Sequence, residues 1–433
     1  MDKKKKKRGF WLLALCLALI PAFEVLFIVG CNSDNLIKFP FFVAIIVINI
    51  LLILLLIYAL IIYNKNKKAS KRKLRTWLKV VLWIISIMYI SGCVAFTILL
   101  YGPNEKFKTW LITTAMNTMN HQYLCKWFYS DNVIYDVLNK NYIKESGEST
   151  NPELIKKKLK EKIKENYNEY EKELLIHEEG ELYKVVKFKV NGANAYIAAV
   201  FDPSKVKLEI TQKIGVIGEY VTEMMRRNNA ILGINAGGFV DQGNNLGESP
   251  TGITIVNKKI ITDNTYGGVT STGGIVGITD DNVLVLLKDK TAEEAIEMGV
   301  RDAVSWGPFL IVNGIASKVS GNGGYGGGAR SAIGQRKDGT ILLLVVDSNA
   351  SRTNGAGMED LVEIMQRYGA YNASNLDGGT SSVMDFRRDI AIKDFKADCH
   401  DYFSKYACHI NDPIDSTGTH TTRYIADAWV VVE

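Results

Sequence analysis

The sequence predicts an α+β protein built from three N-terminal transmembrane helices, a helical connector, and an exported mixed-sheet domain with few helices. Three observations along the 433 residues predict this class. Long apolar stretches occupy residues 1–101, a charged segment with helical periodicity occupies residues 102–180, and short β-rich runs separated by glycine occupy residues 181–433. We expect two helices in the last part, over about residues 218–228 and 357–368. Strand-rich sequence with so few helices favours an α+β arrangement over alternating α/β units.

The apolar stretches cover residues 10–30, 39–63 and 80–100. Each is long enough to cross a hydrocarbon layer of about 30 Å as a helix. The first resembles a secretory signal, but two further stretches follow it and no small-residue cleavage site separates them, so we interpret it as retained. A cleaved or re-entrant segment stays open as the alternative, because Pro21 and Glu24 interrupt the stretch.

Charge predicts the orientation of these helices. Residues 1–101 hold 15 Lys/Arg and 3 Asp/Glu, which leaves 37 basic and 43 acidic residues for the rest of the chain. Basic flanks stay in the cytoplasm, so we expect a multi-pass protein of the cell membrane with a cytoplasmic N-terminus and everything after Tyr101 outside. The slightly acidic remainder gives no reason to expect nucleic-acid binding.

The connector carries one amphipathic pattern. Asn151 is a candidate N-cap ahead of a proline, and apolar residues then recur in steps of three and four from Ile155 to Leu174. We interpret the segment as a stalk or packing helix between membrane and domain. His121 and His177 lie in the connector and are expected to be surface or packing residues rather than catalysts.

Two cysteines, Cys399 and Cys408, lie nine residues apart in the exported part. Disulfides persist outside the cytosol, which favours a bridge between them. A histidine follows each cysteine and leaves zinc as an alternative, although the spacing matches no common finger or ribbon.

The segment GNGGYGGGAR, residues 321–330, contains a G-x-G-x-x-G pattern. A dinucleotide fingerprint needs a strand before it and a helix directly after it, whereas the sequence that follows is typical of a β-hairpin. We therefore reject a dinucleotide site. Two alternatives remain for the glycines, a mobile surface lid or a loop that approaches a ligand closely.

The hairpin that follows predicts a pairing. If Asp338 and Gly339 form a two-residue turn, Arg330 lies opposite Asp347 at the open end. The pair is then either a cross-strand salt bridge or an arginine held for an anionic substrate group such as phosphate.

Two predicted strands end in a polar residue and paired glycines. NLDGGTSS brings Asp377 to the end of one strand, and glycines 378–379 allow a turn whose backbone N–H groups can bind an anion. GINAGGF gives Asn235 the same place ahead of glycines 237–238. An ordinary turn explains either stretch alone, but together they predict one site built from loops at a common edge.

Five motifs in order resemble the phosphodiester glycosidase family: NAGGF, PTG, RSAIG with DGTILLLVVD, GMEDLVEIMQRYGA and NLDGGTSS. The resemblance covers residues from about 190 to 432 and includes RYIADAWVVV, where the family carries an arginine ahead of its last strand. One departure is Thr380, which stands where the family usually has a third glycine. A β-branched residue would be strained there if the position needs a positive φ.

The resemblance implies hydrolysis of a glycosyl 1-phosphodiester. We expect Asp377 to act on the sugar or on water with Asp347 as its partner, and we expect Arg330 to bind phosphate. The other expected contacts with substrate are Arg423, Asn235, Gly237, Gly238, Gly378, Gly379, Thr380, Ser381 and Ser382.

Several alternatives stay open in the sequence. Asp241, Asp347 and Asp377 are hard oxygen ligands near the candidate loops, so a divalent cation as cofactor is neither predicted nor excluded. The expected substrate is a sugar phosphodiester of cell-envelope polysaccharide. A transferase acting on phosphodiester-linked envelope glycans would need a sugar acceptor instead of water, and a non-catalytic glycan-binding envelope protein would bind without turnover. No motif specifies an oligomeric state.

Overall fold

The computed structural model describes residues 84, 88, 91–92, 95–117, 122–153, 155, 167–240, 246–264, 273–349, 354–399, 404–414 and 418–433. The chain divides into two compact units, Met1–Lys140 and Asn141–Glu433.

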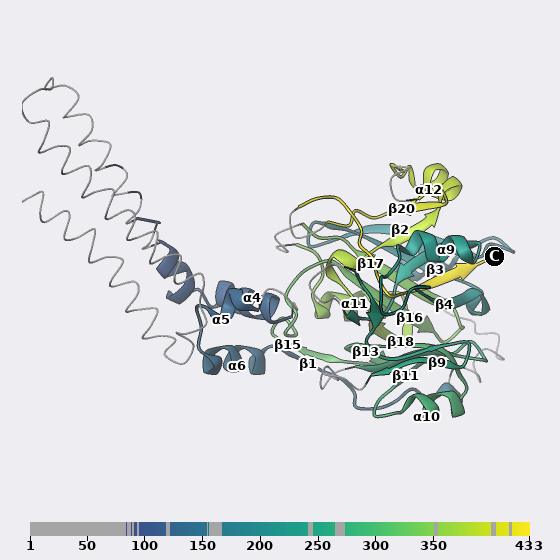
Figure 1. Ribbon diagram of the computed structural model, residues 1–433, viewed down its shortest axis with the longest axis horizontal. Helices are drawn as coiled ribbons and strands as arrows, with labels where there is room; N and C mark the ends of the chain where they lie inside the picture. The colour runs from purple at the N-terminus through teal and green to yellow at the C-terminus, as the bar shows by residue number, and fades with distance from the viewer. Residues whose placement is uncertain are drawn as a thin grey trace, which may run out of the picture. The chain divides into compact units, whose positions relative to one another are not determined.

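The described part of the N-terminal unit contains α4 (Glu105–Met116), α5 (Tyr123–Lys126) and α6 (Asp131–Lys140) (Figure 1). Asn104 caps α4, because its side-chain oxygen accepts the Phe107 N–H at 3.2 Å. These helices bury a small core of their own, made of Leu100, Ile112, Ala115, Cys125, Tyr129, Ile134 and Val137.

The prediction of three transmembrane helices, and of a multi-pass membrane location, is corrected. In the residues that the structure describes, no helix is long and apolar enough to cross a membrane. The longest helix with described bounds in this unit, α4, has 12 residues, or about 18 Å at 1.5 Å per residue, against a hydrocarbon layer of about 30 Å. The stretches at 10–30 and 39–63 lie outside the described residues, and 80–100 does so in part.

The C-terminal unit is built on three larger sheets whose strand pairings are all antiparallel. The seven-stranded sheet has the order β14 (Ile315–Ala316), β13 (Phe309–Val312), β18 (Ala370–Asn375), β16 (Arg330–Arg336), β17 (Ile341–Val346), β3 (Ala193–Val200) and β2 (Tyr183–Val190). A five-stranded sheet has the order β20 (Ala407–His409), β19 (Met384–Arg387), β5 (Ala230–Asn235), β21 (Asp427–Val432) and β4 (Val206–Ile210). A second five-stranded sheet has the order β11 (Leu284–Leu287), β10 (Gly274–Thr279), β12 (Val300–Trp306), β8 (Gly252–Val256) and β9 (Lys259–Asn264).

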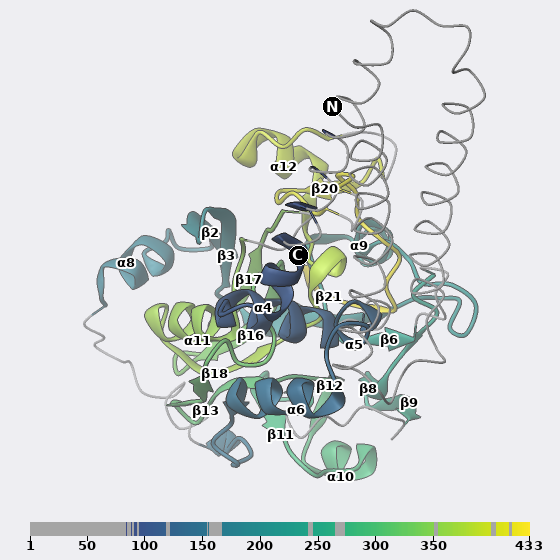
Figure 2. The same ribbon diagram turned by 90° about the vertical axis from the view of Figure 1, so that its left-hand side faces the viewer.

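Two short strand pairs and five α-helices with described bounds also belong to this unit. The pairs are β1 (Tyr142–Lys144) with β15 (Lys318–Ser320) and β6 (Phe239–Val240) with β7 (Ser249–Pro250). The helices are α8 (Glu169–Leu175), α9 (Val221–Arg227), α10 (Ala292–Glu297), α11 (Met358–Arg367) and α12 (Arg388–Phe395). Both views show α12 beside β20 at one end and α10 beside β11 at the other (Figures 1 and 2).

Alternate side chains along the central strands contribute to two different parts of the hydrophobic core. In β17, Leu343 and Val345 join the cluster that contains Trp429 of β21, while Leu342 and Leu344 join the cluster formed with α11. Successive side chains of a strand point to opposite faces, so α11 covers one face of the seven-stranded sheet and the sheet of β5 and β21 covers the other.

The sequence predicted some of these elements and missed others. The helices expected over residues 218–228 and 357–368 are confirmed as α9 and α11. The short helices α10 and α12 were not predicted, although Thr291 caps α10 by accepting the Glu294 N–H at 3.2 Å. A disulfide joins Cys399 and Cys408, as the sequence favoured.

The register of the hairpin formed by β16 and β17 differs from the prediction by one residue. Arg330 lies opposite Val346 rather than Asp347. The turn is longer than expected, because the Gly339 N–H bonds to the Arg336 carbonyl at 3.1 Å and Gly339 adopts a φ of +92°. A turn of this kind adds one residue to the connection, so the predicted cross-strand pair of Arg330 and Asp347 does not form.

Candidate active site

The candidate site lies where the seven-stranded sheet meets the sheet of β5 and β21. Antiparallel pairing of β18 with β16 brings the end of β18 to the start of β16, and pairing of β5 with β21 does the same in the other sheet. A backbone bond joins the sheets at this edge, from the Asp377 N–H to the Ala236 carbonyl at 3.0 Å, while the Leu376 N–H extends the pairing of β18 with β16 by bonding to the Ser331 carbonyl at 2.8 Å. The two strand ends that the sequence singled out therefore lie together.

Asn235, at the end of β5, is 1% exposed. Its amide nitrogen donates to the Asp377 carbonyl at 2.7 Å. Its amide oxygen accepts from the Ser331 hydroxyl at 2.7 Å and from the Val383 N–H at 3.3 Å. The described contacts of the side chain therefore position the loop around Asp377.

Asp377 follows β18 and precedes a short 3₁₀ turn, Gly379–Ser381. Gly379 takes the positive φ of this loop, +66°, whereas Thr380 is not among the positive-φ residues. The strain considered for a β-branched residue at position 380 is therefore absent, because the left-handed position is one residue earlier.

Several of the residues predicted for the site influence the pKa of Asp377. Burial raises the pKa of Asp377, and four groups oppose that rise: the Ser381 hydroxyl, the charge of Arg423, the Gly378 N–H and the charge of Arg330. The structure thus brings together five residues that the sequence predicted for one site.

Arg330 begins β16 and is held by backbone carbonyls. Its Nε donates to the Ala356 carbonyl at 3.2 Å, and its Nη2 donates to the carbonyls of Tyr325 and Gly326 at 3.1 Å each. Its Nη1 lies 3.3 Å from the place where a Cβ on Gly378 would stand. The guanidinium is therefore fixed beside the Asp377 loop, and the glycine-rich segment serves as its support.

The second glycine stretch fits closely against an aromatic ring. A Cβ on Gly238 would stand 1.9 Å from Cζ3 of Trp306, a distance that no side chain tolerates. The next residue, Phe239, lies under the guanidinium of Arg423, whose Cζ is 4.8 Å from the ring centroid. The Trp306 ring therefore requires a glycine at position 238, and Phe239 positions Arg423.

A second carboxyl group at the site was missed by the sequence reasoning. Asp427 begins β21 and is 1% exposed. Its Oδ1 accepts the Gly237 N–H at 2.7 Å. Burial raises the pKa of Asp427 to about 7; the Gly237 hydrogen bond opposes this rise, and the negative charge of Asp377 adds to it. Burial and the negative charge of Asp377 therefore both favour a protonated Asp427 up to near neutral pH.

Residues 228–432 match the family described as phosphodiester glycosidase. Over these residues the chain is similar to that family, and we call this part of the chain the phosphodiester glycosidase domain after the match.

The domain is similar to several other proteins. SPbeta prophage-derived uncharacterized protein YomE of Bacillus subtilis (strain 168) is 28% identical over 168 residues, which are 38% of this chain and 25% of that protein. The chain thus spans about a quarter of that relative's length.

Two solved structures are also similar. The catalytic domain of zebrafish N-acetylglucosamine-1-phosphodiester alpha-N-acetylglucosaminidase, auto-inhibited by its pro-peptide, is 20% identical with a TM-score of 0.43, covering 59% of this chain and 85% of that one. A hypothetical protein from Synechocystis is 14% identical with a TM-score of 0.35, covering 58% and 62% of the two chains.

Asp347 lies in a network next to the carboxyl pair of the phosphodiester glycosidase domain. Its Oδ1 accepts from Asn411 Nδ2 at 2.9 Å and from the Asp412 N–H at 3.0 Å. The same Asn411 amide donates to the Ser382 carbonyl at 3.1 Å. Burial raises the pKa of Asp347, and the charges that act on it are those of Asp412 and Lys187. The role of Asp347 as partner of Asp377 stays a prediction, and Asp427 is the carboxyl whose pKa responds to Asp377.

The described residues of the phosphodiester glycosidase domain give no further support for a divalent-cation site. The described residues contain no group of three or more His, Cys, Asp or Glu side chains able to hold a metal ion. Asp241, one of the three carboxylates considered, lies outside the residues that the structure describes.

Proposed function

We propose that the phosphodiester glycosidase domain hydrolyses a glycosyl 1-phosphodiester at the bond between the anomeric carbon and the phosphate oxygen. The observation that carries this proposal is the Asp377 carboxylate, which interacts with the guanidinium groups of Arg330 and Arg423 and with the charge-sensitive carboxyl of Asp427. A carboxylate beside two cations suits a substrate that joins a sugar to a phosphate anion.

Arg330 and Arg423 bind the phosphate in this proposal. Three carbonyl contacts orient the Arg330 guanidinium before substrate arrives, and the Phe239 ring orients that of Arg423. Fixed cations stabilise developing negative charge without reorganising during the reaction. The Gly378 N–H bonds to the Asp377 carboxylate, so we assign it to the carboxylate rather than to the phosphate.

Asp377 acts in its ionised form, either on the attacking water or on the anomeric carbon. In the first route the water oxygen bonds to the anomeric carbon while Asp377 takes its proton. In the second route Asp377 forms a bond to that carbon, and water releases the sugar in a second step. In both routes the carbon–oxygen bond breaks and its electron pair leaves with the phosphate monoester. Because that leaving group is already a stable anion, protonating it is less important than in ordinary glycoside hydrolysis.

Asp427 contributes a neutral carboxyl in this scheme. Its Oδ2 has no hydrogen-bond donor or acceptor among the described residues and lies 3.4 Å from the place where a Cβ on Gly237 would stand. Because Asp427 is 1% exposed, we propose that its protonated carboxyl acts through its electrostatic interaction with Asp377 rather than through contact with the substrate. Glycosidases commonly use two carboxyl groups, one protonated and one ionised, to hydrolyse the glycosidic bond.

Cell-envelope polysaccharide is the substrate source that we propose. Sugar phosphates joined through phosphodiesters occur in such polymers, and the Cys399–Cys408 disulfide of this domain is typical of proteins outside the reducing cytosol.

The test uses the full-length chain and a panel of sugar 1-phosphodiesters that includes N-acetylglucosamine and glucose. We expect equal amounts of free sugar and phosphate monoester, and we expect Asp377→Asn to lower the rate by about 10³-fold or more. Asp263→Asn, the same substitution at an exposed position of β9, serves as the control and should retain the wild-type rate. Equal rates in the wild type and Asp377→Asn would remove Asp377 from the mechanism.

A further inference from the structure

Residues 141–151 belong to the same compact unit as the phosphodiester glycosidase domain, Asn141–Glu433, although the family match begins only at residue 228. Hydrogen bonds fasten this segment to the unit near both of its ends. Strand β1 pairs with β15 near the start. Near the finish, the Thr150 N–H donates to the Leu286 carbonyl at 2.9 Å, and the Thr150 hydroxyl accepts the Leu286 N–H at 2.9 Å. The segment is therefore a fixed part of the unit, and we call residues 141–151 the strap.

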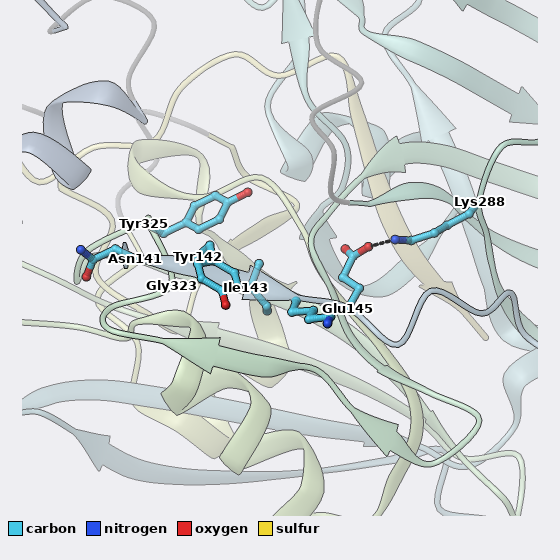
Figure 3. A pocket seen from close by; sticks show the side chains of 8 residues that line it. Asn141, Tyr142, Ile143, Glu145, Lys288, Gly323 and Tyr325 are labelled. Carbon is cyan, nitrogen blue, oxygen red and sulfur yellow. Dashed lines mark ion pairs between the residues drawn. The ribbon is translucent and has the colours of Figure 1, made fainter. Parts of the chain in front are cut away.

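The strap places the carboxylate of Glu145 in the interior of the unit, where the side chain is only 2% exposed. Oε1 of Glu145 accepts the N–H of Gly273 at 2.6 Å and that of Phe309 at 2.7 Å. The carboxylate also forms an ion pair with Lys288, and Figure 3 shows this pair at one end of a pocket of 480 Å³. Hydrogen bonds from N–H groups to an ionised carboxylate are stronger than those between neutral groups, so Glu145 holds both N–H groups firmly.

The peptide group between Pro308 and Phe309 links Glu145 to Asn375. Its N–H donates to Glu145, and its carbonyl accepts the Asn375 N–H at 3.0 Å. The preceding carbonyl, that of Gly307, accepts from Asn375 Nδ2 at 2.9 Å. A peptide group is planar and rigid. Because Glu145 fixes the orientation of this group, it also fixes the acceptor to which the Asn375 backbone is bonded.

Gly273, the second N–H donor to Glu145, lies against the same connection between β12 and β13. Its φ is +88°, and a Cβ at this position would stand 2.6 Å from the Trp306 carbonyl oxygen and 2.8 Å from the Gly307 Cα. The Trp306 ring in turn lies against Gly238 of the candidate site. Glu145 therefore holds the connection between β12 and β13 both directly, at Phe309, and through the close contact of Gly273.

Asn375 transmits this constraint to the candidate site. It is 4% exposed and is the last residue of β18, two residues before Asp377. Its N–H and those of the next two residues bond to three different segments, through the carbonyls of Pro308, Ser331 and Ala236. The connection between β12 and β13 is the first of these three supports, and it is the one that Glu145 anchors.

We infer that Glu145 is a positioning residue for Asp377. Two N–H bonds from Glu145 hold the connection between β12 and β13, and that connection holds the strand end that Asp377 follows. The inference rests on the proposed function of Asp377 and adds to it a residue outside the matched residues 228–432. Turnover should therefore depend on the strap, although the strap precedes the family match.

The test compares the full-length wild type with Glu145→Ala and Glu145→Gln in hydrolysis of the sugar 1-phosphodiesters. We expect kcat of Glu145→Ala to fall about tenfold while KM stays within about twofold, because the described contacts of Arg330 and Arg423 do not involve Glu145. Glu145→Gln should restore most of the rate, since its amide oxygen can still accept both N–H groups. Should Glu145→Ala not fold, Glu145→Asp, whose shorter side chain cannot reach both N–H groups, replaces it.

Glu171→Ala is the control for a general loss of stability. Glu171 forms an ion pair with buried Arg336 at 2.6 Å and bonds to Asn168, and neither partner belongs to the candidate site. We expect Glu171→Ala to lower the melting temperature, as Glu145→Ala does, but to keep kcat within about twofold of the wild type. An equal fall of kcat in the two alanine variants, or a wild-type kcat in Glu145→Ala, would overturn the positioning role.

Amide hydrogen exchange, followed by mass spectrometry without substrate, separates failure of this inference from failure of the proposed function. In peptides that cover residues 374–378, Glu145→Ala should exchange about tenfold faster than the wild type, and Glu171→Ala should not. Faster exchange confined to Gly273 and Phe309 would overturn the inference whatever the activity. Faster exchange at residues 374–378, with no hydrolysis of any phosphodiester by the wild type, would support the link from Glu145 to the Asp377 loop and contradict only the proposed function.

Discussion

Asp377 and Asp427 are coupled carboxyl groups that come from strand ends in different sheets. Asp377 follows β18 and Asp427 begins β21, and the charge of Asp377 helps raise the pKa of Asp427 to about 7. Ser381, Gly378 and two arginines stabilise the ionised form of Asp377, whereas the hydrogen bond from the Gly237 N–H stabilises ionised Asp427. The fold therefore places two chemically identical side chains in different electrostatic surroundings.

The first prediction concerns the pH dependence of activity. If catalysis requires neutral Asp427, kcat/KM should fall about tenfold per pH unit above pH 7 in the wild type. Asp427→Asn cannot ionise and should show a lower plateau without this fall. Initial rates between pH 5 and 9 test the assignment, and an unchanged fall near pH 7 in the variant would assign it to another group.

The second prediction concerns stability. The pKa of Asp427 is about 7 in the folded protein and about 3.9 in an unfolded chain. Below pH 3.9 both states hold the proton, so there is no difference. As the pH rises toward 7 the unfolded state releases the proton first, and the wild type loses stability. The loss is complete above pH 7 and amounts to at most about 4 kcal/mol for about three pKa units.

Asp427→Asn removes this pH dependence while its side-chain oxygen still accepts the Gly237 N–H. We expect the variant to gain stability over the wild type between pH 4 and pH 8, and urea unfolding at four pH values in this range measures the gain. Parallel stability curves for the two proteins would contradict the assigned pKa.

The third prediction tests whether activity depends on the fixed orientation of the Arg330 guanidinium. Arg330→Lys keeps the charge but loses the planar fork that donates to three carbonyl groups. We expect kcat/KM to fall about 10²-fold, and we expect the melting temperature to fall as well, because carbonyl groups that Arg330 satisfies lose their donor. Arg226→Lys, at an exposed position of α9, is the matched control. A wild-type rate in Arg330→Lys would mean that charge alone suffices.

The fourth prediction tests the close contact of Gly238 with Trp306. An alanine methyl group would stand 1.9 Å from the indole ring, so Gly238→Ala should destabilise the domain by about 3 kcal/mol or more. Gly328→Ala, where no heavy atom lies within 4 Å of the added Cβ, should stay within about 0.5 kcal/mol of the wild type. Equal melting temperatures for the two variants would show that Trp306 moves aside without cost.

Local signals predicted the parts of the site that lie next to each other in sequence. The glycine turns after Asn235 and Asp377, and the strands before them, could be predicted because polar residues followed by glycine end an apolar run. Asp427 was missed because its role depends on the pairing of β21 with β5, which joins segments about 190 residues apart. No spacing in the sequence encodes that contact.

Two predictions from the sequence, the pairing of Arg330 and the strain at Thr380, were wrong for similar physical reasons. The register of Arg330 was wrong by one residue because a two-residue turn was assumed, while Gly339 takes a left-handed position in a longer one. The strain considered at Thr380 was misplaced because Gly379 carries the positive φ. Both depend on backbone angles that residue type restricts but does not determine.

The measurement that tests the central claim most directly is hydrolysis in ¹⁸O-labelled water followed by mass spectrometry of both products. Attack at the anomeric carbon, as the interaction of Asp377 with Arg330 and Arg423 leads us to propose, places the label in the released sugar and none in the phosphate monoester. Label found in the phosphate monoester would mean that water attacks phosphorus, and the assignment of a glycosidase reaction to this domain would be contradicted.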